Sequence, residues 1–127
     1  MTQERLKLGR RGEDAAVEFL QEQGYKILEQ NFKSMFGEID IIAEDKETLC
    51  FVEVKTRASG ELGSPFEAVS RMKQRKLSKV ALSYLKAKDL FERSARFDVV
   101  AISKDENGET IIELLKDAFE LSAPYAY

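Results

Sequence analysis

Three acidic side chains and one lysine stand at alternating positions in two short segments of this sequence. Glu38 and Asp40 are two residues apart, and so are Glu53 and Lys55. Side chains at positions i and i+2 of a β-strand project from the same face. If the two segments pair as neighbouring strands, three carboxylates and one ammonium group converge at one end of the sheet. Such a group could bind a divalent cation and act on a phosphodiester.

Mg²⁺ or Mn²⁺ is the cation that these residues favour. Carboxylate oxygens suit hard cations, and Mg²⁺ needs only two or three of them because it usually keeps several waters. The ion lowers the pKa of a bound water and offsets charge on a phosphoryl group. Lys55 could orient the attacking hydroxide or stabilise the phosphoryl oxygens. The alternative is a surface ion pair at a strand end, and the spacing alone leaves both interpretations open.

Glu13 is a further candidate for the same site. It precedes Ala16 and Leu20 by three and seven residues, which places it on the apolar stripe of a predicted helix. An inward carboxylate there could be a metal ligand or a water-positioning group, and the alternative is a partly exposed glutamate at the edge of the stripe. Gly9 and Gly12 would allow a phosphate or another backbone to approach closely, or they could be helix–sheet packing contacts.

Basic residues gather in two segments that are predicted to be helical. Near an acidic site they would hold a phosphate backbone, whereas the alternative is a solvated helix face. The net charge of −3 argues against a protein that coats nucleic acid in bulk. Only local basic patches could therefore bind DNA. The candidate contacts to DNA are Arg10, Arg11, Arg57, Lys73, Gln74 and Lys76.

The composition excludes several other mechanisms. Histidine is absent, which rules out Ser-His-Asp, Cys-His and histidine-based phosphodiesterase chemistry within this chain. The single cysteine, Cys50, lies in an apolar run and is predicted to be a core residue. One thiol cannot form an internal disulfide, which suits the reducing cytoplasm, and no apolar run reaches the length of a membrane span. We therefore expect a cytoplasmic protein with no membrane partner.

Two helices are predicted to flank the acidic segments. Residues 3–23 show helical periodicity, and Gly24 follows as a natural stop. The second helix is predicted to begin at Ser64, where serine, proline and Glu67 form a capping box, and to run to about Lys88.

Five strands are predicted from alternation and turn signals. The run from Leu49 is apolar on both faces, which is expected of a central strand covered on both sides. The order of elements predicts an α/β fold with a mixed β-sheet of about five strands flanked by α-helices. We expect a single domain over residues 1–116 and a C-terminal tail over residues 117–127. The predicted strands are residues 25–32, 38–43, 49–55, 96–102 and 110–115.

The two acidic segments also resemble a known motif. Gly37-Glu38-Ile39-Asp40 followed by Phe51-Val52-Glu53-Val54-Lys55-Thr56-Arg57 is similar to the PD-(D/E)xK nuclease superfamily, with Ile39 where a proline is usual. More closely, the chain resembles the YraN-like bacterial family, an uncharacterised group related to archaeal Holliday junction resolvases. The further segments that carry this resemblance are Gly9-x-x-Gly12-Glu13-x-x-Ala16, Gly24-Tyr25, Asn31-Phe32, Lys76-Leu77 and Arg96-Phe97-Asp98-Val99-Val100.

The resemblance implies a restriction-endonuclease-like fold and a role for each candidate. Asp40 and Glu53 would be metal ligands, Lys55 the catalytic lysine, and Glu13 the helix glutamate of the resolvase-like branch. The implied activity is Mg²⁺- or Mn²⁺-dependent hydrolysis of DNA, including branched or structured DNA. Because resolvase relatives are dimers, a homodimer is implied as well. The alternatives are a catalytically silent module that binds nucleic acid or protein, and a structural protein with an ion-pair network.

Overall fold

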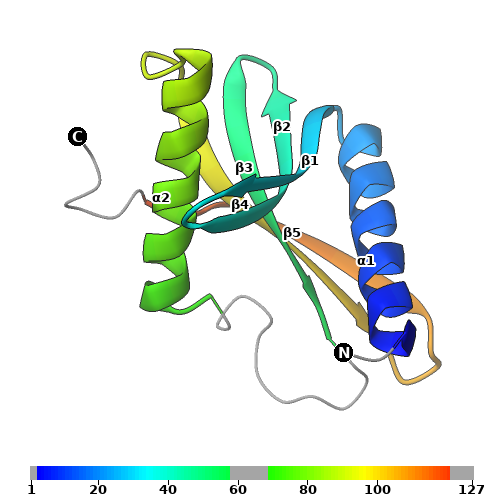
Figure 1. Ribbon diagram of the computed structural model, residues 1–127. Helices are drawn as coiled ribbons and strands as arrows, with labels where there is room; N and C mark the ends of the chain where they lie inside the picture. Colours follow the sequence, from blue (N-terminus) through cyan, green and yellow to red (C-terminus); the bar gives the residue numbers. More distant parts are fainter. Residues whose placement is uncertain (1–2, 58–68, 121–127) are drawn as a thin grey trace.

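The structure contains one five-stranded sheet with a helix on each face (Figure 1). It is a computed structural model that describes residues 3–57 and 69–120, with only the backbone given for residues 3–11. The elements are α1 (Gln3–Glu22), β1 (Lys26–Ser34), β2 (Gly37–Asp45), β3 (Thr48–Thr56), α2 (Arg71–Lys88), β4 (Ala95–Lys104) and β5 (Thr110–Phe119).

The strand order in the sheet follows the order in the chain, from β1 at one edge to β5 at the other. Neighbouring strands are antiparallel except β3 and β4, which run parallel. The predicted mixed sheet of five strands flanked by helices is therefore confirmed. Neither of the helices in the described part is long and apolar enough to cross a membrane.

α1 packs on the sheet through its predicted apolar stripe. Ala16 and Leu20 are fully buried. The helix ends before Gly24, whose φ of +93° is a left-handed conformation that glycine adopts without steric cost. The N–H of Tyr25 then donates to the carbonyl of Leu20 at 2.9 Å. The stop predicted at Gly24 is confirmed.

α2 begins later than the sequence predicted. Its N-cap is Ser70, whose hydroxyl accepts from the N–H of Lys73 at 3.2 Å, and Val69 lies outside the helix. A continuous helix through Val69 and Ser70 was therefore a wrong prediction, because a second serine supplies the cap. The capping box at Ser64 lies outside the described residues. The predicted end near Lys88 is confirmed.

β3 is the central strand, as predicted. Its residues from Leu49 to Glu53 are all buried, because the strand is paired on both edges and covered on both faces. β2 joins it through a tight hairpin whose last pair is Asp45 with Thr48, and Lys46 in the turn has a φ of +57°. The central strand therefore fixes the positions of its last residues, which include the candidate site.

The hydrophobic core consists of two clusters, one on each face of the sheet. Cys50 is fully buried in the second, so its predicted place in the core is confirmed. The cluster beneath α2 contains Ile39, Ile42, Leu49, Phe51, Val69, Leu77, Val80, Ala81, Tyr84, Leu85, Phe97 and Val99. The cluster beneath α1 contains Ala16, Leu20, Tyr25, Ile41, Ala43, Cys50, Val52, Val100 and Ile102.

β5 extends beyond its predicted end at Leu115. It reaches Phe119, whose ring stacks on that of Phe97 with 4.5 Å between the ring centroids. The predicted division between a domain at residues 1–116 and a tail at residues 117–127 falls inside this strand.

A buried polar network lies in the α1 face of the sheet. Asp98 is fully buried and accepts hydrogen bonds from the hydroxyl of Tyr25 at 2.8 Å and from Arg96 Nε at 2.9 Å. Arg96 also donates to Asp45 at 2.7 Å, and Lys116 pairs with Asp45 at 3.2 Å. Every buried charge in this network has a partner, so its effect is structural.

Candidate active site

Asp40 lies where β2 and β3 separate. The paired register of the two strands ends at Ile41 and Val52, and its continuation would set Asp40 opposite Glu53. Instead, the Asp40 carboxylate accepts a hydrogen bond from the backbone N–H of Val54 at 2.8 Å. The side chain thus accepts the hydrogen bond that a backbone carbonyl of β2 would accept in a regular sheet. This contact fixes the carboxylate beside the end of the central strand.

Glu53 continues the alternation of Leu49 and Phe51 and so lies on the α2 side of the sheet. It is only 8% exposed. Lys73, in the first turn of α2, places its Nζ 2.5 Å from Glu53 Oε1. Glu53 therefore does form an ion pair, but its partner comes from α2 and the carboxylate is buried rather than at the surface.

The negative charge at this end of the sheet alters the ionisation of Asp40. Its pKa is raised to about 7, first by burial and then by the neighbouring charges of Glu53 and Glu13. The hydrogen bond from Val54 and the ammonium of Lys73 act in the opposite direction. The carboxylates of Asp40, Glu53 and Glu13 therefore lie close enough together to influence one another electrostatically.

Asn31 is a site residue that the sequence motifs did not assign to the chemistry. With its amide nitrogen turned toward the neighbouring carboxylates, it donates to Glu38 Oε1 at 2.7 Å and to Glu13 Oε2 at 3.3 Å. Its φ of +54° is unusual within a strand and is best tolerated by asparagine among non-glycine residues. Asn31 thereby connects β1 and β2 with α1. Glu38 is exposed and belongs to this contact.

Gly12 brings α1 against the end of the central strand. A β-carbon at this position would lie 2.6 Å from the Thr56 hydroxyl oxygen, closer than nonbonded atoms approach. The helix–sheet packing interpretation of Gly12 is therefore correct. Because Glu13 is the next residue, this close contact positions its carboxylate near the start of β2.

Lys55 is half-buried and follows Glu53 on the same face of β3. Among the residues that the structure describes, it forms no ion pair. Its ammonium group is thus available at the same end of the sheet as the carboxylates.

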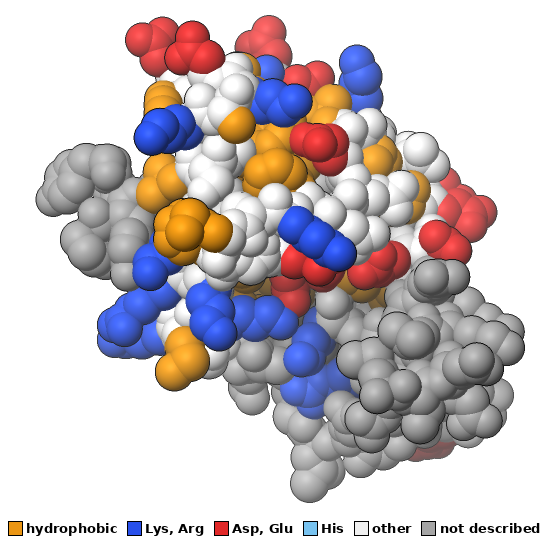
Figure 2. All heavy atoms as spheres, viewed as in Figure 1, with side chains coloured by type: hydrophobic (Ala, Val, Ile, Leu, Met, Phe, Trp, Pro, Cys, Tyr) orange, Lys and Arg blue, Asp and Glu red, His pale blue; other side chains and the backbone are white. Residues whose placement is uncertain are grey.

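The candidate DNA contacts have different surroundings. Lys76 is exposed on α2, whereas Gln74 donates its side-chain N–H to the Val69 carbonyl at 3.1 Å and so closes the start of the helix. Arg57 is half-buried, and its backbone N–H donates to Ile102 at 2.8 Å. Figure 2 shows basic side chains gathered along the side of the molecule that α2 forms. The side chains of Arg10 and Arg11 lie outside the described residues.

The donor set suits Mg²⁺, with Lys73 as a competitor for one of the carboxylates. Carboxylate oxygens are ligands that Mg²⁺ prefers. Within residues 12–57 and 69–120, however, no three acidic side chains stand close enough together to hold a metal as they are. Lys73 already occupies a position beside Glu53 that a cation would take. A divalent ion bound by Asp40 and Glu53 would therefore compete with the Lys73 ammonium for Glu53.

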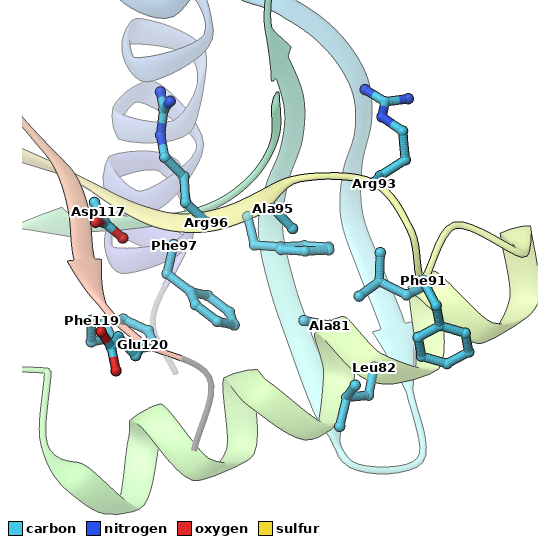
Figure 3. Close-up of a pocket in the computed structure, with 12 residues that line it drawn as sticks. Ala81, Leu82, Phe91, Arg93, Ala95, Arg96, Phe97, Asp117, Phe119 and Glu120 are labelled. Carbon is cyan, nitrogen blue, oxygen red and sulfur yellow. The ribbon is translucent and has the colours of Figure 1, made fainter. Parts of the chain in front are cut away.

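A separate cavity of about 320 Å³ lies between α2 and the sheet, and none of Glu13, Asp40 and Glu53 lines it (Figure 3). Phe97 and Phe119 point into it, with Ala81 and Leu82 on the helix side, while the guanidinium groups of Arg93 and Arg96 point away. Most of the labelled side chains that face it are apolar, and it contains none of the predicted catalytic residues.

Fold and site together define a small α/β protein with an acidic site at the end of its central strand, between two helices. The chain belongs to the uncharacterised protein family UPF0102, whose family model matches residues 12–102. The family expected from the sequence motifs is thus confirmed.

Relatives in this family cover nearly the whole chain. A UPF0102 protein of Syntrophus aciditrophicus is 53% identical over 122 residues, which is 96% of this chain and 94% of that protein. A UPF0102 protein of Geotalea uraniireducens is 49% identical over 115 residues, which is 91% of each chain.

Among solved structures, SfsA of Pyrococcus furiosus in complex with Ca²⁺ is similar at a TM-score of 0.40 and 16% identity. The alignment covers 86% of this chain and spans 62% of the length of SfsA.

Proposed function

We propose that this protein is a Mg²⁺- or Mn²⁺-dependent nuclease that hydrolyses phosphodiester bonds of DNA, including branched or structured DNA. The observation that carries the proposal is that Asp40 and Glu53 lie together where β2 and β3 separate, the Asp40 carboxylate accepting from the Val54 N–H and Lys55 lying on the same strand face as Glu53. The resemblance of these residues to the PD-(D/E)xK motif supports the same assignment.

The residues would divide the chemistry among them. Asp40 and Glu53, with Glu13 as a further donor, would hold the cation. When bound, Mg²⁺ lowers the pKa of water and offsets charge on the phosphoryl group. Lys55 would orient the attacking water and stabilise the charge that develops on the phosphoryl oxygens. Exposed basic residues such as Lys76 would hold the phosphate backbone.

A silent binding module is the second candidate, and one observation favours it. The Lys73 ammonium already pairs with Glu53 at 2.5 Å, so part of the negative charge is balanced without a metal. In a protein that only binds, this pair would stay intact. Metal binding and cleavage therefore have to be measured separately.

The decisive experiment incubates linear, flapped and four-way-junction DNA with the protein in Mg²⁺ or Mn²⁺. Glu53→Ala and Lys55→Ala should both abolish cleavage. Glu18→Gln, a charge change at an exposed position of α1, should not. Calorimetry with Mg²⁺ alone measures the metal site. Cleavage that survives Glu53→Ala, or DNA binding without cleavage by the unaltered protein, would overturn the nuclease proposal.

A further inference from the structure

A groove between one flank of α2 and the turn that joins β1 to β2 exposes aromatic rings. Met35 and Phe36, at the turn between β1 and β2, are 90% and 41% exposed, and Phe91 beyond the end of α2 is 57% exposed. These residues line a shallow groove of about 800 Å³ together with Leu82 and Ser83 of the helix. Large exposed hydrophobic side chains that share one groove typically mark a binding surface.

The charged residues of the groove are basic. Lys79 and Lys86 line it, and none of the lining residues that the structure describes is acidic. The Nζ of Lys79 lies 5.5 Å from the centroid of the Phe36 ring. Figure 2 shows hydrophobic and basic side chains interspersed on the α2 side of the molecule. The surface therefore offers π faces and positive charge to the same ligand.

The groove lies along the same helix that supplies Lys73, farther toward its C-terminal end. Lys73, which pairs with Glu53, precedes Lys79 by six residues and Lys86 by thirteen. At a helical rise of about 1.5 Å per residue, the groove lies about 9 to 20 Å from Lys73 along the axis of α2. A strand of nucleic acid held at the acidic site could therefore reach the groove within a few nucleotides.

We propose that this groove binds unpaired nucleotides, with bases stacked on Phe36 and Phe91 and phosphates contacted by Lys79 and Lys86. The inference rests on the proposed function and specifies its substrate as DNA with a single-stranded arm. Single-strand binding sites combine aromatic platforms with a basic track in this way, because every base has a π face. Both charged residues that line the groove, Lys79 and Lys86, are basic, so charge complementarity favours a nucleic acid over a purely hydrophobic partner.

The test measures binding in EDTA, so that it does not depend on cleavage. The probes are a labelled dT12 oligonucleotide and a 12-mer of abasic sites, which carries the phosphates without the bases. Phe36→Leu combined with Phe91→Leu keeps the surface apolar but removes both rings. Met72→Ala, at an exposed residue of α2 that does not line the groove, is the matched control.

We expect the double leucine variant to bind dT12 about tenfold more weakly or worse, with little change for the abasic strand. Lys79→Gln with Lys86→Gln should lower the slope of log affinity against log salt by about 1.4, the value for two phosphate contacts on a single strand. Unchanged urea midpoints would show that both double variants are folded.

Two results would overturn the inference. One is equal affinity of the unaltered protein for dT12 and the abasic strand. The other is that the unaltered protein does not bind dT12 but does bind an acidic peptide of alternating Glu and Phe, and that the double leucine variant binds this peptide equally well. That result would identify a protein-docking surface. Loss of cleavage in Mg²⁺ with dT12 binding intact would count against the nuclease activity alone.

Discussion

The carboxylate of Asp40 accepts a hydrogen bond of 2.8 Å from the backbone N–H of Val54, a residue of the neighbouring strand. A side chain thereby replaces the backbone partner that β3 would otherwise find in β2. The hydrogen bond stabilises the charged form of Asp40, whereas burial and the charges of Glu53 and Glu13 oppose it more strongly. The position of the carboxylate is thus fixed while its proton affinity is high.

The first prediction concerns stability and pH without metal. Between about pH 4 and about pH 7 the folded protein retains a proton on Asp40 that the unfolded chain has released, so the free energy of unfolding falls as pH rises. Asp40→Asn should remove this pH dependence and stabilise the protein by about 2 kcal/mol at pH 8. The whole shift in the pKa of Asp40 corresponds to about 4 kcal/mol, which is the upper limit of this gain. Urea unfolding in EDTA at pH 5 and pH 8 measures both. A variant that gains no more stability at pH 8 than at pH 5 would contradict this prediction.

The second prediction concerns the ammonium group beside Glu53. Lys73→Gln leaves a buried carboxylate without its cation, so the metal-free protein should lose about 1 to 2 kcal/mol of stability. Mg²⁺ no longer competes with a tethered charge and should bind about tenfold more tightly by calorimetry. Lys76→Gln, on the exposed side of the same helix, is the control and should change neither quantity. Weaker Mg²⁺ binding by Lys73→Gln would show that the lysine does not compete with the metal.

The third prediction tests the close contact between α1 and β3. Gly12→Ala should cost about 1 to 3 kcal/mol, because the new methyl group would lie 2.6 Å from the Thr56 hydroxyl oxygen. Thr56→Ala removes that oxygen, so the double variant should recover most of the loss. The double-mutant cycle in urea gives the coupling energy. Additive effects of the two substitutions would mean that the contact does not limit the approach of the helix.

The fourth prediction concerns the polar network. Asp98→Asn should lower the free energy of unfolding by about 3 kcal/mol, because it leaves the Arg96 guanidinium without its buried counter-charge. Asp45→Asn, at a more exposed member of the network, should cost about 1 kcal/mol or less. Urea midpoints of the two variants test the difference. Equal losses would argue that burial of Asp98 does not govern the energetics.

Much of the fold could be predicted because its signals are local. The apolar run from Leu49 identified a central strand, and Gly24 marked the end of the first helix. The start of α2 could not be located in this way, since serine caps helices well at either position and the local sequence does not rank Ser70 above Ser64. The extension of β5 to Phe119 depends on a stacking partner, Phe97, that is distant in the chain.

The candidate site could be predicted only in part, for a similar reason. Alternation along the two strands predicted that Asp40 and Glu53 converge on one site. The apolar stripe of the first helix predicted that Glu13 faces the same site. The Lys73 partner of Glu53 comes from another element, and no spacing rule connects the two. Asn31 was missed because a left-handed residue inside a strand leaves no periodic signal in the sequence.

The polar network has a consequence for the order in which the protein is made. Tyr25 and Asp45 precede the parallel crossover, whereas Arg96 and Asp98 follow it. A nascent chain that has emerged only as far as Asp89 has an open edge on β3 and a tyrosine hydroxyl with no carboxylate to accept its hydrogen bond. The native sheet is therefore completed only when the last third of the chain has left the ribosome. Until then the open edge of β3 can pair with strands of other chains and aggregate.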